Sequence, residues 1–433
     1  MVMRIAANGQ SSKQNQSGSE EGQPRRQAAA VATVFLVASE PTFLTPTHGL
    51  PAAVVAFLIT VFLLAGIPRQ RSSAYWLLPA ILVVVVGSSF AWSILPSETL
   101  LGGAALAVLT ITAYWIAAKV SLPSFINGLI AGAFTALLLS LLLAAVRPDL
   151  GLVAEAYKFG SLRGIYEHRN QMGYTMTIGV VGLAMNGRIW RGSRRTWAIL
   201  LLVAFVGAVG YSASSSALAM TAFALILALV VRSISKSKVK LRLFLLTHYV
   251  LVGAFGCWLV FNQFGAVTGL LGRDETLTGR TTIWPPVIEA WSYSPMLGYG
   301  WGAVWSDDSF VADWVSRQVD GYRVYHAHDS YLDVLIQIGI IGLIAFGLCL
   351  LFSLFRSGLW LNLALRDQLS LDWAFPNALI TTMALYSIVE TRISHPLGLL
   401  VIFYVILLRS PIQEMRPRGY QRRAYKYAPL PNK

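Results

Sequence analysis

Two histidines separated by a single residue stand just before a long apolar segment that begins near residue 330. His326 and His328 are followed directly by Asp329. Imidazole has an ordinary pKa of about 6.5, so a histidine can accept a proton from a hydroxyl group at neutral pH. We therefore expect His328 to act as a general base and His326 to support it or to bind an acceptor. The Asp329 carboxylate would raise the basicity of a histidine beside it.

Arginines in two polar stretches, about 147–171 and 265–328, form a second group with chemical potential. The candidates are Arg163, Arg169 and Arg280. A guanidinium binds phosphate oxygens through two parallel hydrogen bonds, and a site of low dielectric strengthens such contacts. We expect Arg280 and Arg169, and after them Arg163, to stabilise negative charge on a substrate or leaving group. The alternative is ordinary salt bridging with acidic residues of the same stretches.

The elements that must position these residues are predicted to be membrane helices. The chain has 433 residues, of which 55% are hydrophobic and only 12% are charged, and its mean hydropathy is +0.60. Because soluble domains carry about 25% charged residues, this composition excludes a soluble nucleic-acid-binding protein and a long disordered chain. Apolar runs of about 18 or more residues with few charges predict membrane-spanning helices.

Such runs indicate an all-α polytopic membrane protein with about 12 transmembrane helices. The predicted segments are 28–46, 50–67, 74–95, 99–118, 124–146, 172–188, 196–211, 213–231, 243–264, 329–355, 372–391 and 396–409.

The distribution of charge predicts an orientation for these segments. With both termini cytoplasmic, most of the 34 Lys and Arg residues lie inside, in agreement with the positive-inside rule. Residues 1–27 are then a disordered cytoplasmic tail, and 410–433 form a basic tail near the inner leaflet. The transmembrane domain, 28–409, carries an outer loop over 147–171. One large extracytoplasmic loop, 265–328, joins the ninth and tenth spans.

The large outer loop is rich in aromatic residues, among them Trp284 and Tyr299. Aromatic rings stack on sugar faces, although amphipathic helices at a membrane interface show the same enrichment. Glu390 and Arg392 lie at the outer end of the eleventh segment and could pair with each other. Ionisable residues so close to a membrane are candidates for function.

Three motifs fall on this predicted outer face. One runs from Gly164 to Gly173, one is Thr278-Gly-Arg-Thr-Thr-Ile-Trp284 followed by 295–300, and one runs from His326 to Gly342 with nine residues between Asp329 and Gly339. Together they resemble the O-antigen ligase and O-antigen or exopolysaccharide polymerase superfamily, and most closely its exopolysaccharide-polymerase branch. Asp329 departs from the amide or hydroxyl residue that is usual there.

The resemblance implies a membrane-embedded glycosyltransferase of the GT-C type. It would move a glycan from undecaprenyl pyrophosphate to a hydroxyl of an acceptor glycan or glycolipid, on the outer face of the bacterial plasma (inner) membrane. The resemblance also implies that it would need no cofactor, metal or nucleotide sugar. Its partners would be the bilayer, the lipid-linked donor and polysaccharide-assembly proteins, and no nucleic acid. Implied catalytic residues are His328, Arg280 and Arg169; implied substrate-binding residues are Arg163, His326, Asn170, Tyr299, Trp284 and Asp329.

Alternatives remain at this stage. Polymerase and ligase share a donor and are not separated by the sequence. The His-x-His pattern is also half of a metal site, but no further ligands have convincing spacing, although Asp307, Asp308 and Asp329 could be recruited. Another class of function is a transporter or flippase for a glycolipid or a small anion, since about twelve spans are typical of transporters. A non-catalytic scaffold of an export complex is a third reading.

Overall fold

The computed structural model describes residues 22–41, 50–67, 75–154, 159–187, 189–190, 192–235, 280–319, 323–366 and 369–411. Within these ranges the chain is helical, and its only β contact is an isolated antiparallel bridge between Leu152 and Leu162. Helices satisfy every backbone hydrogen bond within one segment, which a lipid environment demands.

The helices follow one another with short connections. The first covers 22–38 and therefore begins inside the segment 1–27 that was expected to be a tail. The others are α2 (Leu50–Leu63), α3 (Leu77–Ser88), η2 (Ser89–Trp92), α4 (Pro96–Lys119), α5 (Leu122–Val146), α6 (Pro148–Gly151), α7 (Arg169–Met185), α8 (Arg194–Tyr211), α9 (Ser215–Ser235), α12 (Arg280–Ser292), α13 (Phe310–Arg317), α14 (Ser330–Leu365), η4 (Leu371–Ala374), α15 (Phe375–Tyr386) and α16 (Pro396–Leu407).

Five of the described helices are long and apolar enough to cross a membrane: α4, α5, α8, α9 and α14. The class, an all-helical membrane protein, is thereby confirmed, whereas the count of twelve spans and their orientation stay predictions. Most predicted segments coincide with a helix, but several of these helices are short, and the predicted segment 243–264 lies outside the described residues. Large apolar side chains such as Phe62, Val203 and Leu351 point outward, as expected of surfaces that face lipid.

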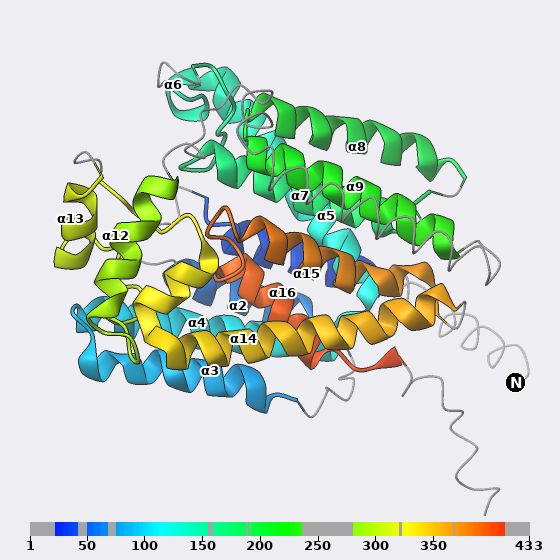
Figure 1. Cartoon of the computed structure of the whole chain (residues 1–433). Coiled ribbons are helices and arrows are strands. Elements are labelled where there is room, and N and C mark those ends of the chain that lie inside the picture. The colour runs from blue at the N-terminus through cyan, green and yellow to red at the C-terminus, as the bar shows by residue number, and fades with distance from the viewer. Residues whose placement is uncertain are drawn as a thin grey trace, which may run out of the picture.

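Two helices form the centre of the bundle. Every residue of α16 from Leu397 to Leu407 is buried, and α7 is buried along almost its whole length. Figure 1 shows α7, α15 and α16 between the pair α8 and α9 on one side and α3, α4 and α14 on the other. Helices that are surrounded in this way hold their end residues in fixed positions, because packed interiors resist displacement.

One end of the bundle carries the functional motifs. Helices α12 and α13 lie together at this end, beside the first turns of α14 (Figure 1). They share a small apolar core that includes Val287, Val304, Val315 and Ile336. Residues of the predicted large outer loop therefore form a compact unit that rests on the membrane helices.

A kink in α14 joins this unit to the bundle. Ile338 and Gly339 leave the helical conformation, and Gly339 has a φ of 65°. The backbone amides of the next two residues, 340 and 341, donate to the carbonyls of Pro295 and Met296 at 2.9 and 3.3 Å. The loop that follows α12 thus replaces the hydrogen bonds that the kink removes from α14.

We predict that Gly339→Ala destabilises the protein. A Cβ atom at this position would lie 2.2 Å from the Met296 carbonyl oxygen, and its φ and ψ of 65° and −167° suit glycine almost alone. The expected loss is about 1–3 kcal/mol or more, seen as a lower unfolding midpoint of the detergent-solubilised protein. Gly347→Ala on the same helix is the control, because a Cβ atom added there would have no other atom within 4 Å. Equal midpoints for the two variants would contradict the prediction.

Candidate functional site

A completely buried carboxylate, Glu390, lies in the loop between α15 and α16. Its Oε1 is 2.5 Å from Nη2 of Arg280 and also accepts a hydrogen bond from the Asn170 amide. Its Oε2 is 3.5 Å from Nδ1 of His328 and 3.9 Å from Nη2 of Arg392. We call these five residues the Glu390 cluster. The cluster unites all three motifs, since each supplies one of its members.

The cluster forms where three helices begin. Arg280 is the first residue of α12, Asn170 is in the first turn of α7, and α14 begins at Ser330. The Ser330 amide donates to the Ser387 carbonyl at 2.9 Å, and its hydroxyl accepts from the Arg392 amide at 2.8 Å. These bonds fix the 387–393 loop against the start of α14. The positive ends of the three helix dipoles also favour the Glu390 carboxylate.

The backbone holds His328 in an uncommon conformation. Its φ is 52°, a left-handed value that costs a residue with a Cβ atom free energy. The Ala327 amide donates to Asp333 at 3.1 Å, and the Ala327 carbonyl accepts from the Trp284 indole at 3.0 Å. The His328 amide donates to Nδ1 of His326 at 3.2 Å. Trp284 therefore acts on the site by holding the loop that carries the histidines.

Asp329 has a clear structural role. Its Oδ1 accepts from the amides of Tyr331 and Leu332 at 2.7 and 2.9 Å, so the side chain caps the first turn of α14. The described contacts of this carboxylate are to the backbone and not to a histidine. An aspartate here can cap the helix as the more usual amide or hydroxyl side chain would, because all of these side chains accept hydrogen bonds.

Arg169 lies next to Asn170 but points to a different target. Its guanidinium donates to the carbonyls of Ser212 and Ala213, which form the turn between α8 and α9. The side chain is buried, and its charge influences the neighbouring His168. Arg169 thus borders the cluster and joins α7 to the α8–α9 turn. Its catalytic role stays a prediction.

Arg163 and Tyr299 bind backbone groups away from the cluster. Arg163 donates to the carbonyls of Leu150 and Asp149 at 2.9 and 3.1 Å. The Tyr299 hydroxyl donates to the Ala290 carbonyl at 2.6 Å. Each contact stabilises a turn, so the described structure does not bring these two side chains to Arg280 and His328. Their predicted contact with substrate stays a prediction.

The surroundings keep the Glu390 carboxylate ionised and disfavour the charged forms of the nearby His326 and His168. Burial alone would raise the pKa of Glu390, but His328, Arg280 and Arg392 hold it well below its ordinary value. Burial and the neighbouring His328 keep the pKa of His326 well below the ordinary value, and burial lowers that of His168 to about 4. The site near neutral pH therefore combines guanidinium groups, one carboxylate and neutral imidazoles at these two positions.

Three groups here have the chemistry of metal ligands. The nearest donor atoms of His326, His328 and Glu390 all lie within 4.8 Å of one another, a set that zinc accepts. Arg280 and Arg392 approach the same carboxylate. Two guanidinium groups within 4.0 Å of the carboxylate would repel a divalent cation bound to it. The arrangement therefore fits an anion better than a metal.

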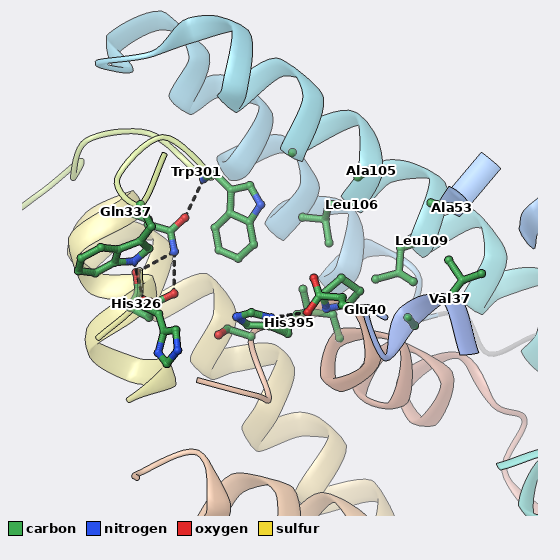
Figure 2. Close-up of a pocket in the computed structure, with 18 of the residues that line it drawn as sticks. Val37, Glu40, Ala53, Ala105, Leu106, Leu109, Trp301, His326, Gln337 and His395 are labelled. Carbon is green, nitrogen blue, oxygen red and sulfur yellow. Dashed lines mark hydrogen bonds and ion pairs between the residues drawn. The ribbon is translucent and has the colours of Figure 1, made fainter. Parts of the chain in front are cut away.

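A cavity of about 340 Å³ lies beside the cluster: His326 lines it, and the centroid of the His326 ring is 4.0 Å from that of the His328 ring. Its apolar walls include Ala105, Leu106 and Leu109, which lie on one face of α4. Figure 2 shows Trp301, Gln337 and His326 toward one end of the cavity and Val37 and Ala53 toward the other, with His395 and Glu40 between them. Along α4 the lining extends from residue 102 to 112, about 15 Å at 1.5 Å per residue. This shape, polar at one end and apolar at the other, suits an amphiphilic ligand.

Two ionisable residues of the cavity were not predicted from the sequence. His395 Nδ1 lies 2.6 Å from Oε2 of Glu40, although the residues are 355 positions apart. A signal was nevertheless present, because Glu40 is the one ionisable residue inside the predicted segment 28–46 and His395 directly precedes the segment 396–409.

Comparison with known proteins supports the resemblance inferred from the motifs. A family described as O-antigen ligase matches residues 198–347, which contain Arg280, His326 and His328. The chain is also 26% identical over 274 residues to "Exopolysaccharide production protein ExoQ" of Rhizobium meliloti (strain 1021). The match covers 61% of this chain and spans 61% of the length of that relative.

We predict that Glu390→Gln strongly destabilises the protein, because Arg280 and Arg392 then lose the carboxylate beside them. Breaking a buried pair by removing one partner costs about 3–5 kcal/mol. The double variant Arg280→Gln/Glu390→Gln should regain part of this loss, as an interaction term in a thermodynamic cycle of unfolding midpoints. Arg147→Gln is the control, since its pair with Asp149 is exposed and should matter little. If the effects of Arg280→Gln and Glu390→Gln on the free energy of unfolding simply add up, the proposed pairing of Arg280 with Glu390 is contradicted.

Proposed function

From the similarity to the O-antigen ligase family and to an exopolysaccharide production protein, we propose that the chain is a polysaccharide polymerase or ligase. The proposed reaction transfers a glycan from undecaprenyl pyrophosphate to a hydroxyl of an acceptor glycan or glycolipid. The proposed location is the extracytoplasmic face of the bacterial plasma membrane, at the bundle end that carries the Glu390 cluster.

The observation that carries this proposal is the pair of buried arginines beside an accessible histidine. Arg280 and Arg392 are 3% and 5% exposed, whereas the His328 side chain is 27% exposed. When the anomeric C–O bond breaks, negative charge grows on the diphosphate leaving group. Guanidinium groups fixed in a site of low dielectric stabilise that charge more in the transition state than in the bound substrate.

The other cluster residues are proposed to keep the arginines in place. Glu390 orients Arg280 and Arg392. The side-chain amide of Asn170, in the first turn of α7, donates to Glu390 and holds it in place. His328 faces the diphosphate or the donor sugar from the loop that Trp284 supports. Arg169 is proposed to add positive charge from the start of α7 while it fixes the α8–α9 turn.

We predict that Arg280→Lys greatly reduces elongation of a purified undecaprenyl-pyrophosphate-linked oligosaccharide in proteoliposomes. Lysine keeps the charge but loses the planar pair of donors. Loss of one well-placed donor to a developing anion costs about 10²–10³-fold in kcat. Product length is measured on gels or by mass spectrometry after release of the glycan.

Arg317→Lys is the matched control, because Arg317 lies on α13 in the same unit but is exposed. It should elongate glycan as the unchanged protein does. Full activity of Arg280→Lys would contradict the proposed role. Movement of the intact lipid-linked oligosaccharide across the bilayer without any change in its covalent structure would instead identify a transporter.

A further inference from the structure

The ion pair of Glu40 and His395 has the geometry of a base and the carboxylate that orients it. His395 Nδ1 and Glu40 Oε2 are 2.6 Å apart, and the two side chains are 32% and 30% exposed. Both side chains line the cavity. An imidazole that gives its Nδ1 hydrogen to a carboxylate presents Nε2 as a proton acceptor, as in hydrolases that use a histidine and an acid.

The backbone holds both residues firmly. His395 directly precedes α16; its amide donates to the Arg392 carbonyl at 3.3 Å, and its carbonyl accepts from Leu399 at 3.0 Å. Glu40 follows the helix 22–38 with a φ of 55°. A non-glycine residue in this conformation is uncommon and often marks a functional position. In Figure 2 the His395 ring lies between Glu40 on one side and Trp301 and His326 on the other.

The polar end of the cavity has the composition of a sugar site. Trp301, Trp305 and Tyr325 supply aromatic rings, and Gln337 supplies an amide. Apolar side chains of α4 line the same cavity, and low-dielectric surroundings of this kind strengthen the attraction between Glu40 and His395. A glycan hydroxyl in this end of the cavity would therefore find a base and stacking surfaces together.

The pKa of His395 shifts in the opposite direction from those of His326 and His168. Burial alone would lower the pKa of His395, but the charge and hydrogen bond of Glu40 raise it above the ordinary value. The charged groups that act on the pair are Arg392, which opposes protonation of His395, and Asp333, which favours it; His326 faces the pair with a lowered pKa. His395 is thus adapted to carry a positive charge, which His326 and His168 are not.

Glu390, the carboxylate near His328, has more competing partners than Glu40, the carboxylate that pairs with His395. Glu390 already accepts from Arg280 and Asn170 and lies 3.5 Å from His328. Among the described residues, the ion-pair partner of Glu40 within 4.0 Å is His395. A proton taken up at His395 is therefore stabilised by a carboxylate that none of the described arginines contacts within 4.0 Å.

We propose that His395, oriented by Glu40, removes the proton from the acceptor hydroxyl in the transfer reaction. The acceptor oxygen forms a bond to the anomeric carbon of the donor glycan, and the bond from that carbon to the diphosphate breaks. The electron pair leaves with the diphosphate toward Arg280 and Arg392. The hydroxyl proton passes to Nε2 of His395 and later to water. This inference rests on the proposed function and assigns His328 to the donor side of the site.

The test is the pH dependence of elongation in the proteoliposome assay for the unchanged protein, Glu40→Gln and His395→Gln. Because the base must be neutral, the rate of the unchanged protein should rise with pH as His395 loses its proton. Glu40→Gln removes the group that raises the pKa of His395, so the rise should move to lower pH while kcat falls. His395→Gln should lose about 10²–10⁴-fold in kcat together with the pH-dependent rise.

Three comparisons keep the test decisive. Glu289→Gln, an exposed change of the same kind on α12, should leave rate and pH profile unchanged. Glu40→Asp should retain more activity than Glu40→Gln. His395→Ala should regain activity when imidazole is added, which a purely structural defect would not allow.

Separate outcomes would overturn the inference and the proposed function. The same rise with pH in His395→Gln, or its loss in His328→Gln alone, would show that His395 is not the base although elongation occurs. Absence of elongation by the unchanged protein would instead reject the proposed function.

Discussion

A buried carboxylate must have cationic partners, and the need to pair Glu390 organises the candidate site. An unpaired ion in an apolar interior costs several kcal/mol, so Glu390 is compatible with the fold only where Arg280, Asn170 and His328 reach it. Those three residues come from three separate segments of the chain. The pairing therefore links the start of α7, the start of α12 and the loop before α14 in one arrangement.

The same constraint explains why the site suits an anion. Arg280 and Arg392 approach one carboxylate, so an anion is a better additional partner here than a cation. The helices supply the rigidity that preorganised charge stabilisation requires, because α7 and α16 are buried along their lengths. The cavity beside the cluster adds an apolar region that reaches along α4.

Much of the fold could be predicted from the sequence, because apolar runs report helices directly. The three motifs were expected on one face, and in the structure Arg280, Asn170 and His328, one from each motif, meet at Glu390. Their roles in catalysis and binding stay predictions. The target of Arg169 could not be predicted: it is a pair of backbone carbonyls in the turn after α8. Trp284 and Tyr299 were expected to meet sugar, yet their polar atoms bind backbone carbonyls.

The cavity could not be predicted from local sequence patterns. Glu40 and His395 are separated by 355 positions, and no spacing rule joins residues from the first and last described helices. Their contact depends on how the whole bundle packs. The kink at Gly339 is similar: the glycine was recognised as part of a motif, but its purpose, docking of the loop after α12, is visible only in three dimensions.

The most direct test of the Glu390 cluster as a diphosphate site is an experimental structure of the protein in lipid nanodiscs with bound undecaprenyl pyrophosphate. We expect diphosphate density within hydrogen-bonding distance of the Arg280 and Arg392 guanidinium groups, with His328 beside it. Diphosphate density at another part of the molecule, with the Glu390 cluster closed and unchanged, would contradict this assignment.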